Sequence, residues 1–528
     1  MSTPTSQIKV CSGVRLTNAY RHTIYFSSRE EQRLFFEGKV VHGFPDYTYL
    51  RKNWSIKVET TMENALTWDY LFFTNSSDGK EWYYFITNIQ YLNDNTVELF
   101  LELDVMQTYL FDYELLPCFV EREHAATDMV GLNVVDEDLE LGEYVVASSS
   151  DASLAETSIM LLCTSNPEYA ANNDLELNLE FANMYDGVFS GLSVYRVPSS
   201  DATTLGTILT KLDDAGKSEC IVSMWMYPSS LIKSESSGTT KKVTGKKDAN
   251  KEISRGDSLG PGVGYTPRNK KLLTYPYNFL YVTNNCGGAA VYHYEHFADW
   301  GSCNFRIVGS ITPDAAVRCY PLNYKNEQHA FEEGLSLANF PSCAWDSDMY
   351  KLWLAQNQHQ LQNAASLAVV KAVGGVVTAG VSLATGNLAG VGAGAATLYS
   401  GLADINGQMA MKKDKAIQPE QAKGNYSSTV NTAAGFQTFT FKKKSITIPM
   451  AQKLDAYFDM YGYRTLAVKV PNRAVRENWT FTKTIGCTIR GAFCVEDRTK
   501  IESIFDNGIT FWKNGNSIGD YSLSNACE

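Results

Sequence analysis

One apolar segment restricts what this chain can fold into more than any other feature of its sequence. Residues 364–405 consist mainly of Ala, Gly, Val, Leu, Ser and Thr, and between Lys371 and Asp404 the phenol of Tyr399 is the only ionisable side chain. A helix that crosses a hydrocarbon core of about 30 Å needs about 20 residues, so the segment is long enough to cross twice. Thr385-Gly386-Asn387, near its middle, favours a turn. The segment therefore predicts an apolar helical hairpin.

The side chains of this hairpin indicate how it would behave at a membrane. A tandem G-x-x-x-G spacing allows helices to approach closely in lipid, and the glycines expected to do so are Gly386, Gly390 and Gly394. The residues expected to insert into lipid are Leu367, Val369, Val370, Val373, Val376, Val377, Val381, Leu383, Leu388, Val391 and Leu398. Since Gly, Ala, Ser and Thr gain little on transfer to lipid, insertion should depend on exposure of the segment and on several copies acting together. A buried hairpin or a glycine-rich loop is the alternative, although such small side chains pack poorly in a core.

Outside this segment the sequence predicts a mainly β protein with a few short helices. The 528 residues include 30 Tyr and 25 Phe but only 15 Pro, and aromatic side chains favour strands. Residues 97–105 alternate between apolar and largely acidic side chains, and residues 81–91 are rich in aromatic residues. The polar residues 93–95 between them predict the turn of a hairpin.

Short-range signals also predict helices and a second hairpin. Residues 27–31 resemble a capping box that opens a helix ending at Gly38. Pro449 begins another helical pattern, which Gly462 would end. Residues 509–512 are apolar and precede a polar turn with Asn and Gly, so they predict a hairpin near the end of the chain.

We expect four regions along the chain. Residues 1–150 and 426–528 are β domains, residues 151–350 form a β-rich middle region, and residues 351–425 contain the apolar segment. Within the middle region, residues 231–264 are rich in Lys, Ser and Gly and have almost no aromatic residues. That composition predicts an exposed, mobile loop rather than a nucleic-acid-binding patch, because no aromatic residues for base stacking are interleaved.

Three acidic residues are the strongest candidates for catalysis. Glu98, Glu102 and Asp104 occupy alternate positions of one expected strand, so they would share a face. Paired carboxylates can perform the acid and base steps of glycoside hydrolysis, but such a face is more often simply solvated. We therefore expect no enzyme activity.

Cysteine and histidine residues gather in one part of the sequence. Cys286, His293, His296 and Cys303 are close together, but their spacing matches no zinc module. Residues 289–297 predict a strand, on which His293 and His296 would point in opposite directions. We therefore expect no metal site and no cofactor.

The balance of charge and the N-terminal residues limit the possible partners and the site of synthesis. The formal net charge of −12 disfavours tight binding of nucleic acid through phosphate contacts. The first residues lack both a basic stretch and an apolar stretch, so we expect synthesis in the cytoplasm without export through a signal peptide.

Separated passages of the chain resemble one protein family. They are residues 104–109 through 119–124 (DVMQTYLFDYELLPCFVEREH), residues 458–463, residues 479–491 and residues 501–512 (IESIFDNGITFW). On these motifs the chain is similar to the tail knob, or distal tail tube, proteins of small short-tailed phages. The resemblance covers most of the chain, and residues 151–350 contribute little to it.

The resemblance implies a virion protein at the tail tip, made in the cytoplasm of the host. Six copies would form a β-barrel-based tube that continues the lower collar tube, with residues 1–150 as a tube domain and residues 426–528 completing the tube. The apolar loops would plug the tube and, at infection, enter the host cytoplasmic membrane as a channel for the genome. A sixfold ring would carry six times the negative charge of one chain, which suits a passage through which phage DNA slides without specific binding.

Two other functions remain open from the sequence. A peptidoglycan hydrolase at the tail tip would use Glu98, Glu102 or Asp104. A self-standing pore-forming protein would use the apolar segment without any collar partner.

Overall fold

The structure of the chain, a computed structural model, describes residues 7–344 and 438–527 apart from short gaps. The gaps are residues 46–47, 51–53, 76–78, 153, 155, 165–182, 186–187, 191, 200, 215–219, 235–239, 313–314, 339 and 341. The chain divides into two compact units. Unit 1 comprises Met1–Glu143, Tyr265–Thr274 and Thr447–Glu528, and unit 2 comprises Tyr144–Gly264 and Tyr275–Ile446. Unit 1 thus joins the beginning and the end of the chain.

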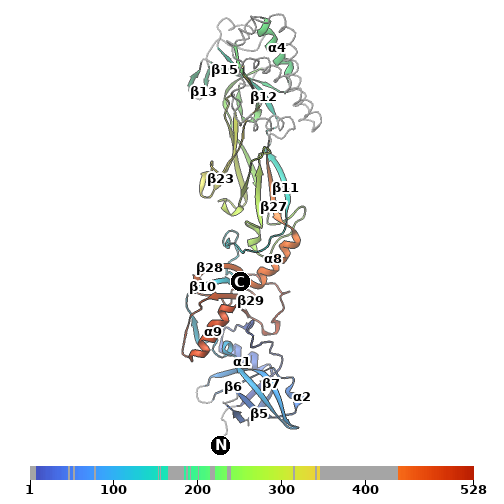
Figure 1. Cartoon of the computed structure of the whole chain (residues 1–528), viewed down its shortest axis with the longest axis vertical. Helices are drawn as coiled ribbons and strands as arrows, with labels where there is room; N and C mark the ends of the chain where they lie inside the picture. The colour runs from blue at the N-terminus through green and yellow to red at the C-terminus, as the bar shows by residue number, and fades with distance from the viewer. Residues whose placement is uncertain are drawn as a thin grey trace, which may run out of the picture. The chain divides into compact units, whose positions relative to one another are not determined.

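Unit 1 contains a seven-stranded antiparallel sheet that curls into a half-barrel (Figure 1). Its strands, in spatial order, are β3 (Val40–Phe44), β1 (Ile8–Cys11), β6 (Tyr70–Thr74), β7 (Glu81–Asn93), β8 (Thr96–Leu103), β5 (Ser55–Glu59) and β4 (Thr48–Leu50). The pairing of β7 with β8 confirms the predicted hairpin. Among the described residues, β3 and β4 are the edges of the sheet, so a single chain builds part of a barrel rather than a closed one.

Both faces of this sheet are buried because successive side chains of a strand point to opposite faces. Tyr70 and Phe72 of β6 enter one core, and Leu71 between them enters the other. Three short helices accompany the sheet: α1 (Arg29–Glu37), α2 (Met62–Ala65) and α3 (Val105–Thr108). The Ser28 hydroxyl accepts a hydrogen bond from the Glu31 amide, and Gly38 ends α1, as the capping pattern predicted.

A second sheet of unit 1 is built from both ends of the chain. Its strands are β2 (His22–Ile24), β31 (Ile509–Trp512), β29 (Trp479–Ile485), β10 (Cys118–Glu123) and β28 (Tyr463–Lys469). Two further strands, β9 (Tyr113–Leu115) and β30 (Ile489–Gly491), pair with each other. The hairpin predicted after residue 512 is wrong: β31 pairs with β29 on one side and, in parallel, with β2 on the other, so neither edge is left for a returning strand.

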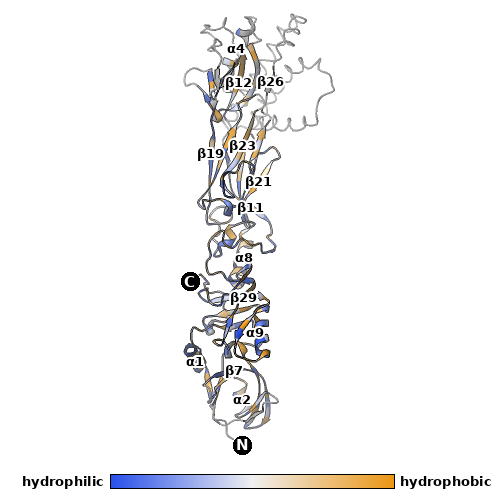
Figure 2. Ribbon diagram, turned by 90° about the vertical axis from the view of Figure 1, so that its left-hand side faces the viewer, coloured by the Kyte–Doolittle hydropathy of each residue, from blue (hydrophilic) through white to orange (hydrophobic). Residues whose placement is uncertain are grey.

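Two longer helices complete unit 1. Helix α8 (Ile448–Tyr461) has Pro449 in its first turn and ends at Gly462, as predicted. Helix α9 (Val495–Asn507) shows both hydrophilic and hydrophobic residues (Figure 2), and its Ile501, Ile504 and Phe505 are buried in the core of the unit. A single-turn 3₁₀ helix, η7 (Gly515–Ser517), follows β31.

Residues 265–274 belong to unit 1 although the chain on both sides of them belongs to unit 2. The buried carboxylate of Asp455 on α8 holds them in place. It accepts hydrogen bonds from the amides of Arg268 (2.8 Å) and Asn269 (2.9 Å) and from the Tyr265 hydroxyl (2.6 Å). A 3₁₀ turn, η5 (Lys270–Leu273), follows.

Unit 2 consists of antiparallel sheets that share one apolar core. The four-stranded sheet contains β11 (Tyr144–Ala152), β27 (Phe439–Ile446), β20 (Asn278–Thr283) and β21 (Ala289–Tyr292).

The six-stranded sheet contains β17 (Ile232–Ser234), β18 (Lys241–Lys246), β15 (Leu192–Pro198), β12 (Thr157–Thr164), β16 (Ile221–Pro228) and β26 (Ser342–Ala344). The five-stranded sheet contains β19 (Ala249–Ser254), β22 (Ser302–Gly309), β23 (Ala316–Tyr324) and β24 (Glu327–His329), with β25 (Leu335–Ala338) paired to β23. The smaller elements are β13 (Asn183–Tyr185), β14 (Val188–Ser190), α4 (Ala202–Asp214), η4 (Ser229–Leu231) and η6 (Tyr294–His296).

The expectation of a loop over residues 231–264 is wrong for most of the lysine cluster. Strands β18 and β19 lie within this range, and the side chains of Val243 and Ile253 are buried. Strand pairing with β15, β17 and β22 outweighs the weak strand preference of Lys, Gly and Asn. The predicted fold class, mainly β with few helices, is confirmed for the described residues.

Candidate functional site

The chain is anchored in unit 2 on both sides of the apolar segment. Before the segment, β26 pairs with β16 at the edge of the six-stranded sheet. After it, β27 lies between β11 and β20 inside the four-stranded sheet. The side chains of Phe340 and Phe439, on either side of the segment, are both buried in the core of unit 2. We call β25, β26 and β27 the stems of the apolar segment.

Two neighbouring asparagines in the turn between β20 and β21 bind the chain on both sides of the segment. The Asn284 side-chain amide donates to the carbonyl of Ser336 in β25 (2.7 Å). The Asn285 amide donates to the carbonyl of Thr438 (2.9 Å) and to the hydroxyl of Thr440 (3.0 Å) at the start of β27. We call Asn284 and Asn285 the stem clamp. Sequence reasoning missed it because the partners are 52 and 153 residues away and no short-range pattern marks them.

The turn itself keeps the stem clamp in position. The side-chain oxygen of Asn284 accepts hydrogen bonds from the backbone amides of Cys286 (2.9 Å) and Gly288 (2.8 Å). Asn285 has a positive φ of 55°, a conformation that Asn tolerates better than most residues. A side chain at Gly288 would collide with the Asn284 amide, which is 2.6 Å from the position of a Cβ atom.

The predicted membrane-inserting residues and helix-packing glycines, from Leu367 to Leu398, lie outside the described residues. Their helical hairpin therefore stays a prediction. In the part of the chain that the structure describes, no helix combines the length and the apolar character needed to cross a membrane.

The passages that carry the family resemblance meet in unit 1. Asp104 is the N-cap of α3, and its buried carboxylate accepts hydrogen bonds from the Met106 and Gln107 amides (3.0 and 3.1 Å). It also accepts one from the Tyr70 hydroxyl (2.8 Å), and burial raises its pKa to about 6. At the end of the same helix, the Tyr109 hydroxyl donates to Asp497 of α9 (2.7 Å).

His124 connects the other end of the first passage to two later ones. Its Nδ1 accepts a hydrogen bond from the Phe481 amide (2.7 Å), and its Nε2 donates to the Asp459 carbonyl (3.0 Å). The Trp479 indole donates to the same carbonyl (2.7 Å). Because the two ring nitrogens have these partners, the imidazole is neutral, and burial lowers its pKa to about 3. The family motifs therefore encode contacts that join the two ends of the chain.

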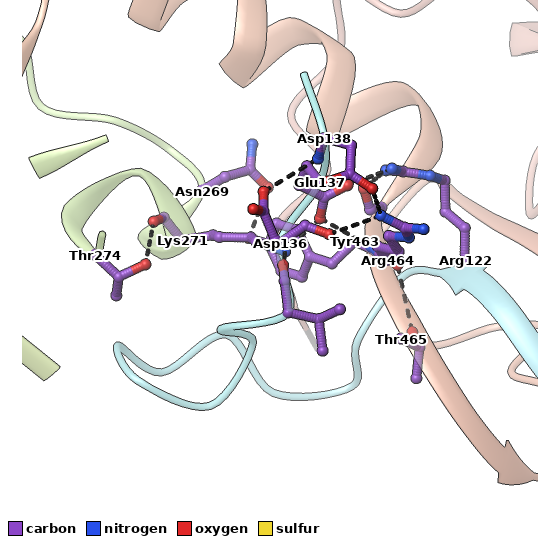
Figure 3. Close-up of polar contacts among 12 residues, drawn as sticks. Arg122, Asp136, Glu137, Asp138, Asn269, Lys271, Thr274, Tyr463, Arg464 and Thr465 are labelled. Atoms are coloured by element: carbon purple, nitrogen blue, oxygen red, sulfur yellow. Dashed lines mark hydrogen bonds and ion pairs between the residues drawn. The ribbon is translucent and has the colours of Figure 1, made fainter. Parts of the chain in front are cut away.

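A buried group of charges, the Glu137 hub, joins three distant segments of unit 1 (Figure 3). The side chain of Glu137 is fully buried and binds both Lys271 of η5 and Arg122 of β10. It also accepts a hydrogen bond from the Arg464 amide (2.9 Å), while the Arg464 side chain binds Asp138. Burial lowers the pKa of Lys271, and the Glu137 carboxylate beside it opposes that shift. No sequence pattern marks this hub, because Glu137 and Lys271 are 134 residues apart.

The three acidic residues considered for catalysis do not form one exposed face. Strand β8 ends at Leu103, so Asp104 lies beyond the strand, and its carboxylate is buried as the cap of α3. Glu98 is buried and accepts a hydrogen bond from Ser55 (2.5 Å). Glu102 binds Lys500 (2.8 Å). The shared face predicted from alternation is therefore wrong for Asp104.

The structure also corrects the geometry expected for the cysteine and histidine residues. The predicted strand ends with β21 at Tyr292, and His293 and His296 lie around the 3₁₀ turn η6. Their rings stack with centroids 4.9 Å apart instead of pointing in opposite directions. The cluster of ligand-type side chains among the described residues contains His293, Glu295 and His296, and it includes neither Cys286 nor Cys303.

Comparisons with known proteins agree with this arrangement. A family model described as the C-terminal domain of the tail knob protein gp9 of Bacillus phage phi29 matches residues 236–526. A second model, for the N-terminus of the caudoviral major tail protein, matches residues 4–114. The tail knob proteins gp9 of Bacillus phages B103 and phi29 are 25% and 24% identical to the chain, and each alignment covers 98% of both sequences.

A solved structure has the same fold. The tail knob protein gp12 of bacteriophage C1 matches 99% of this chain and 100% of its own with a TM-score of 0.66, at 14% identity. At that identity the similarity shows the fold alone. The family match and the relatives that align over nearly the whole length show more: the chain belongs to the family of phage tail knob proteins that includes gp9 of Bacillus phage phi29, structural components of the virion tail.

Proposed function

We propose that six copies of this chain form the distal tail tube of a short-tailed phage, and that the apolar segments of the six copies plug this tube. On infection the segments enter the host cytoplasmic membrane and form a channel through which the genome passes. Residues 1–150 and 426–528 build the tube in this proposal, and residues 351–425 are the membrane-active part. The protein acts as a structural component and not as an enzyme.

The half-barrel of unit 1 supports assembly into a ring. Strands β3 and β4 end the seven-stranded sheet among the described residues, and unpaired strand edges favour pairing with another chain. Neighbouring copies would close the barrel that one chain leaves open. The lower collar tube of the virion is the expected partner at one end of the ring.

The anchoring of the apolar segment is the observation that carries the membrane proposal. Its stems are strands of unit 2, and the stem clamp bonds the chain on both sides of the segment. A segment whose flanking strands belong to a β scaffold can leave a tube without detaching from that scaffold. The scaffold therefore keeps an inserted channel attached to the protein that delivers the DNA.

The net charge supports passage of DNA without binding. Each chain carries a formal charge of −12, so a tube of several copies repels phosphate groups on average. Repulsion of this kind lowers the affinity of the wall for DNA and lets the genome slide.

Replacing residues 364–405 with a Gly/Ser linker of equal length tests the proposal. Electron microscopy of the purified variant should show the same hollow six-fold tubes as the unmodified protein, because the stems are unchanged. Leakage of dye from anionic liposomes should occur with the unmodified protein and not with the variant. Equal leakage from both would refute the membrane role, and the absence of six-fold tubes in the unmodified protein would refute the tube.

A further inference from the structure

Three side chains of metal-ligand type converge at the turn that follows β21. His293, Glu295 and His296 each place one ligand atom within 4.8 Å of the others. The Nδ1 atom of His293 lies 3.7 Å from a carboxylate oxygen of Glu295. The 3₁₀ turn η6 (Tyr294–His296) follows His293, and the rings of His293 and His296 stack with their centroids 4.9 Å apart. Glu295 reaches the same side.

The surrounding residues hold the side chains of His293 and Glu295 in place before any ligand arrives. The ring of Tyr275 stacks on that of His293, with centroids 3.9 Å apart and planes 6° from parallel. The Tyr275 amide donates to both oxygens of the Glu295 carboxylate, at 3.3 Å each. The His293 amide donates to the Tyr324 hydroxyl (3.2 Å), and the His296 carbonyl accepts from the Lys325 amide (2.9 Å). Hydrogen bonds to a ligating carboxylate, such as those from the Tyr275 amide, orient metal ligands in proteins.

We propose that His293, Glu295 and His296 bind one divalent transition-metal ion, with Zn²⁺ preferred. Two imidazoles and one carboxylate form a ligand set that suits zinc and its neighbours, and it leaves a position for water. Ca²⁺ and Mg²⁺ require oxygen ligands, so the imidazole nitrogens disfavour them.

The geometry and charge of the cluster allow the ion to enter. Ligand atoms about 2.1 Å from a tetrahedral zinc lie about 3.4 Å from one another, so separations of up to 4.8 Å must shorten by up to about 1.4 Å. His296 is exposed, so its side chain can make that movement. Lys325, whose amide bonds the His296 carbonyl, pairs through its side chain with Glu333 (2.6 Å), and this pairing offsets its repulsion of a cation.

Binding should be measured on the full chain without a histidine tag, after treatment with a chelator. Isothermal titration with Zn²⁺ should show one ion per chain, and titration with Mg²⁺ should show none. Co²⁺ should give the visible absorption bands of a site with nitrogen and oxygen ligands. A folded, unmodified chain that binds no Zn²⁺ would overturn the proposal.

Two variants and a control assign the site. His296→Ala and Glu295→Gln should each weaken Zn²⁺ binding at least tenfold. His329→Ala removes another exposed histidine of unit 2, on β24, and should leave the affinity unchanged. Far-ultraviolet circular dichroism confirms that each variant is folded. Zinc binding that is equally strong in His296→Ala, Glu295→Gln and the unmodified chain would place the ion elsewhere and contradict the assignment.

Discussion

Asn284 and Asn285 are adjacent in the chain, yet their side chains bond parts of the chain that lie on opposite sides of the apolar segment. Asn284 donates to Ser336 before the segment, and Asn285 donates to Thr438 after it. The turn between β20 and β21 therefore secures one stem before the segment, β25, and the stem after it, β27. The chain is therefore held to unit 2 at Ser336 before the segment and at Thr438 and Thr440 after it.

The stem clamp makes a testable contribution to stability. Asn285→Gly keeps the positive φ of 55° accessible but removes the hydrogen bonds to Thr438 and Thr440. We expect a loss of about 1–2 kcal/mol in the free energy of unfolding, measured by urea denaturation. Asn326→Gly is the matched control, because Asn326 also has a positive φ (66°) but is exposed in the turn between β23 and β24. Equal losses in the two variants would contradict a specific role for Asn285.

Because the buried carboxylate of Glu137 joins two cations, replacing it should strongly reduce the free energy of unfolding. Glu137→Gln leaves the buried Lys271 without a carboxylate, and breaking a buried pair costs about 3–5 kcal/mol. Denaturant unfolding of the variant measures this loss. Asp138→Asn breaks the neighbouring pair with Arg464, in which Asp138 is 70% exposed, so it should cost less than about 1 kcal/mol. A Glu137→Gln variant as stable as Asp138→Asn would show that the hub contributes little.

Gly462 occupies a position that admits no side chain. Its φ of 65° and ψ of −153° lie in a region almost restricted to glycine, and a Cβ atom would overlap the Glu123 carbonyl. Gly462→Ala should therefore cost at least about 3 kcal/mol or prevent folding. Gly486 also has a positive φ (67°), but nothing lies within 4 Å of the place for its Cβ, so Gly486→Ala should cost about 1–2 kcal/mol. Similar melting temperatures for the two variants would contradict this explanation.

His124 should make unit 1 sensitive to acid. The pKa of the buried imidazole is about 3 in the folded chain, whereas an unfolded histidine takes a proton near pH 6.5. Below pH 6.5 the unfolded state binds more protons, so the stabilisation present above that pH is lost as the pH falls toward 3, by up to about 1.4 kcal/mol per unit. His124→Gln lacks the titrating group, and its unfolding free energy should fall less steeply between pH 7 and pH 4.5.

The titration of Asp104 has the opposite effect on stability. Comparing the unmodified chain with His124→Gln removes the contribution of Asp104. Burial raises the pKa of Asp104 to about 6, so the folded state binds an extra proton between about pH 6 and 4 and gains stability there. This contribution is the same with and without His124. The difference between the two curves therefore isolates His124, and parallel curves would show that its titration is irrelevant.

Features that depend on neighbours in sequence were predictable. The β7–β8 hairpin, the capping of α1 by Ser28 and Gly38, and the ends of α8 follow from turn and cap residues a few positions apart. The passages that resemble the tail knob family were also recognisable, and three of them contact one another through His124, which bonds Phe481 and Asp459.

Features that depend on distant partners were not predictable. The lysine-rich strands β18 and β19 form because other strands pair with them, and β31 has no return strand because β2, almost 500 residues earlier, occupies its free edge. The stem clamp and the Glu137 hub join residues that are far apart in the chain. His293 and His296 meet because a 3₁₀ turn replaces the expected strand. Side chains three residues apart point to opposite faces of a strand but to the same side of a 3₁₀ turn.

Genome delivery by virions that carry the Gly/Ser replacement of residues 364–405 tests the central claim most directly. The account predicts that these virions assemble with normal tails and adsorb to cells, but that labelled DNA does not enter the cytoplasm. DNA entry at the level of unmodified virions would contradict the claim that the apolar segment forms the passage through the host membrane.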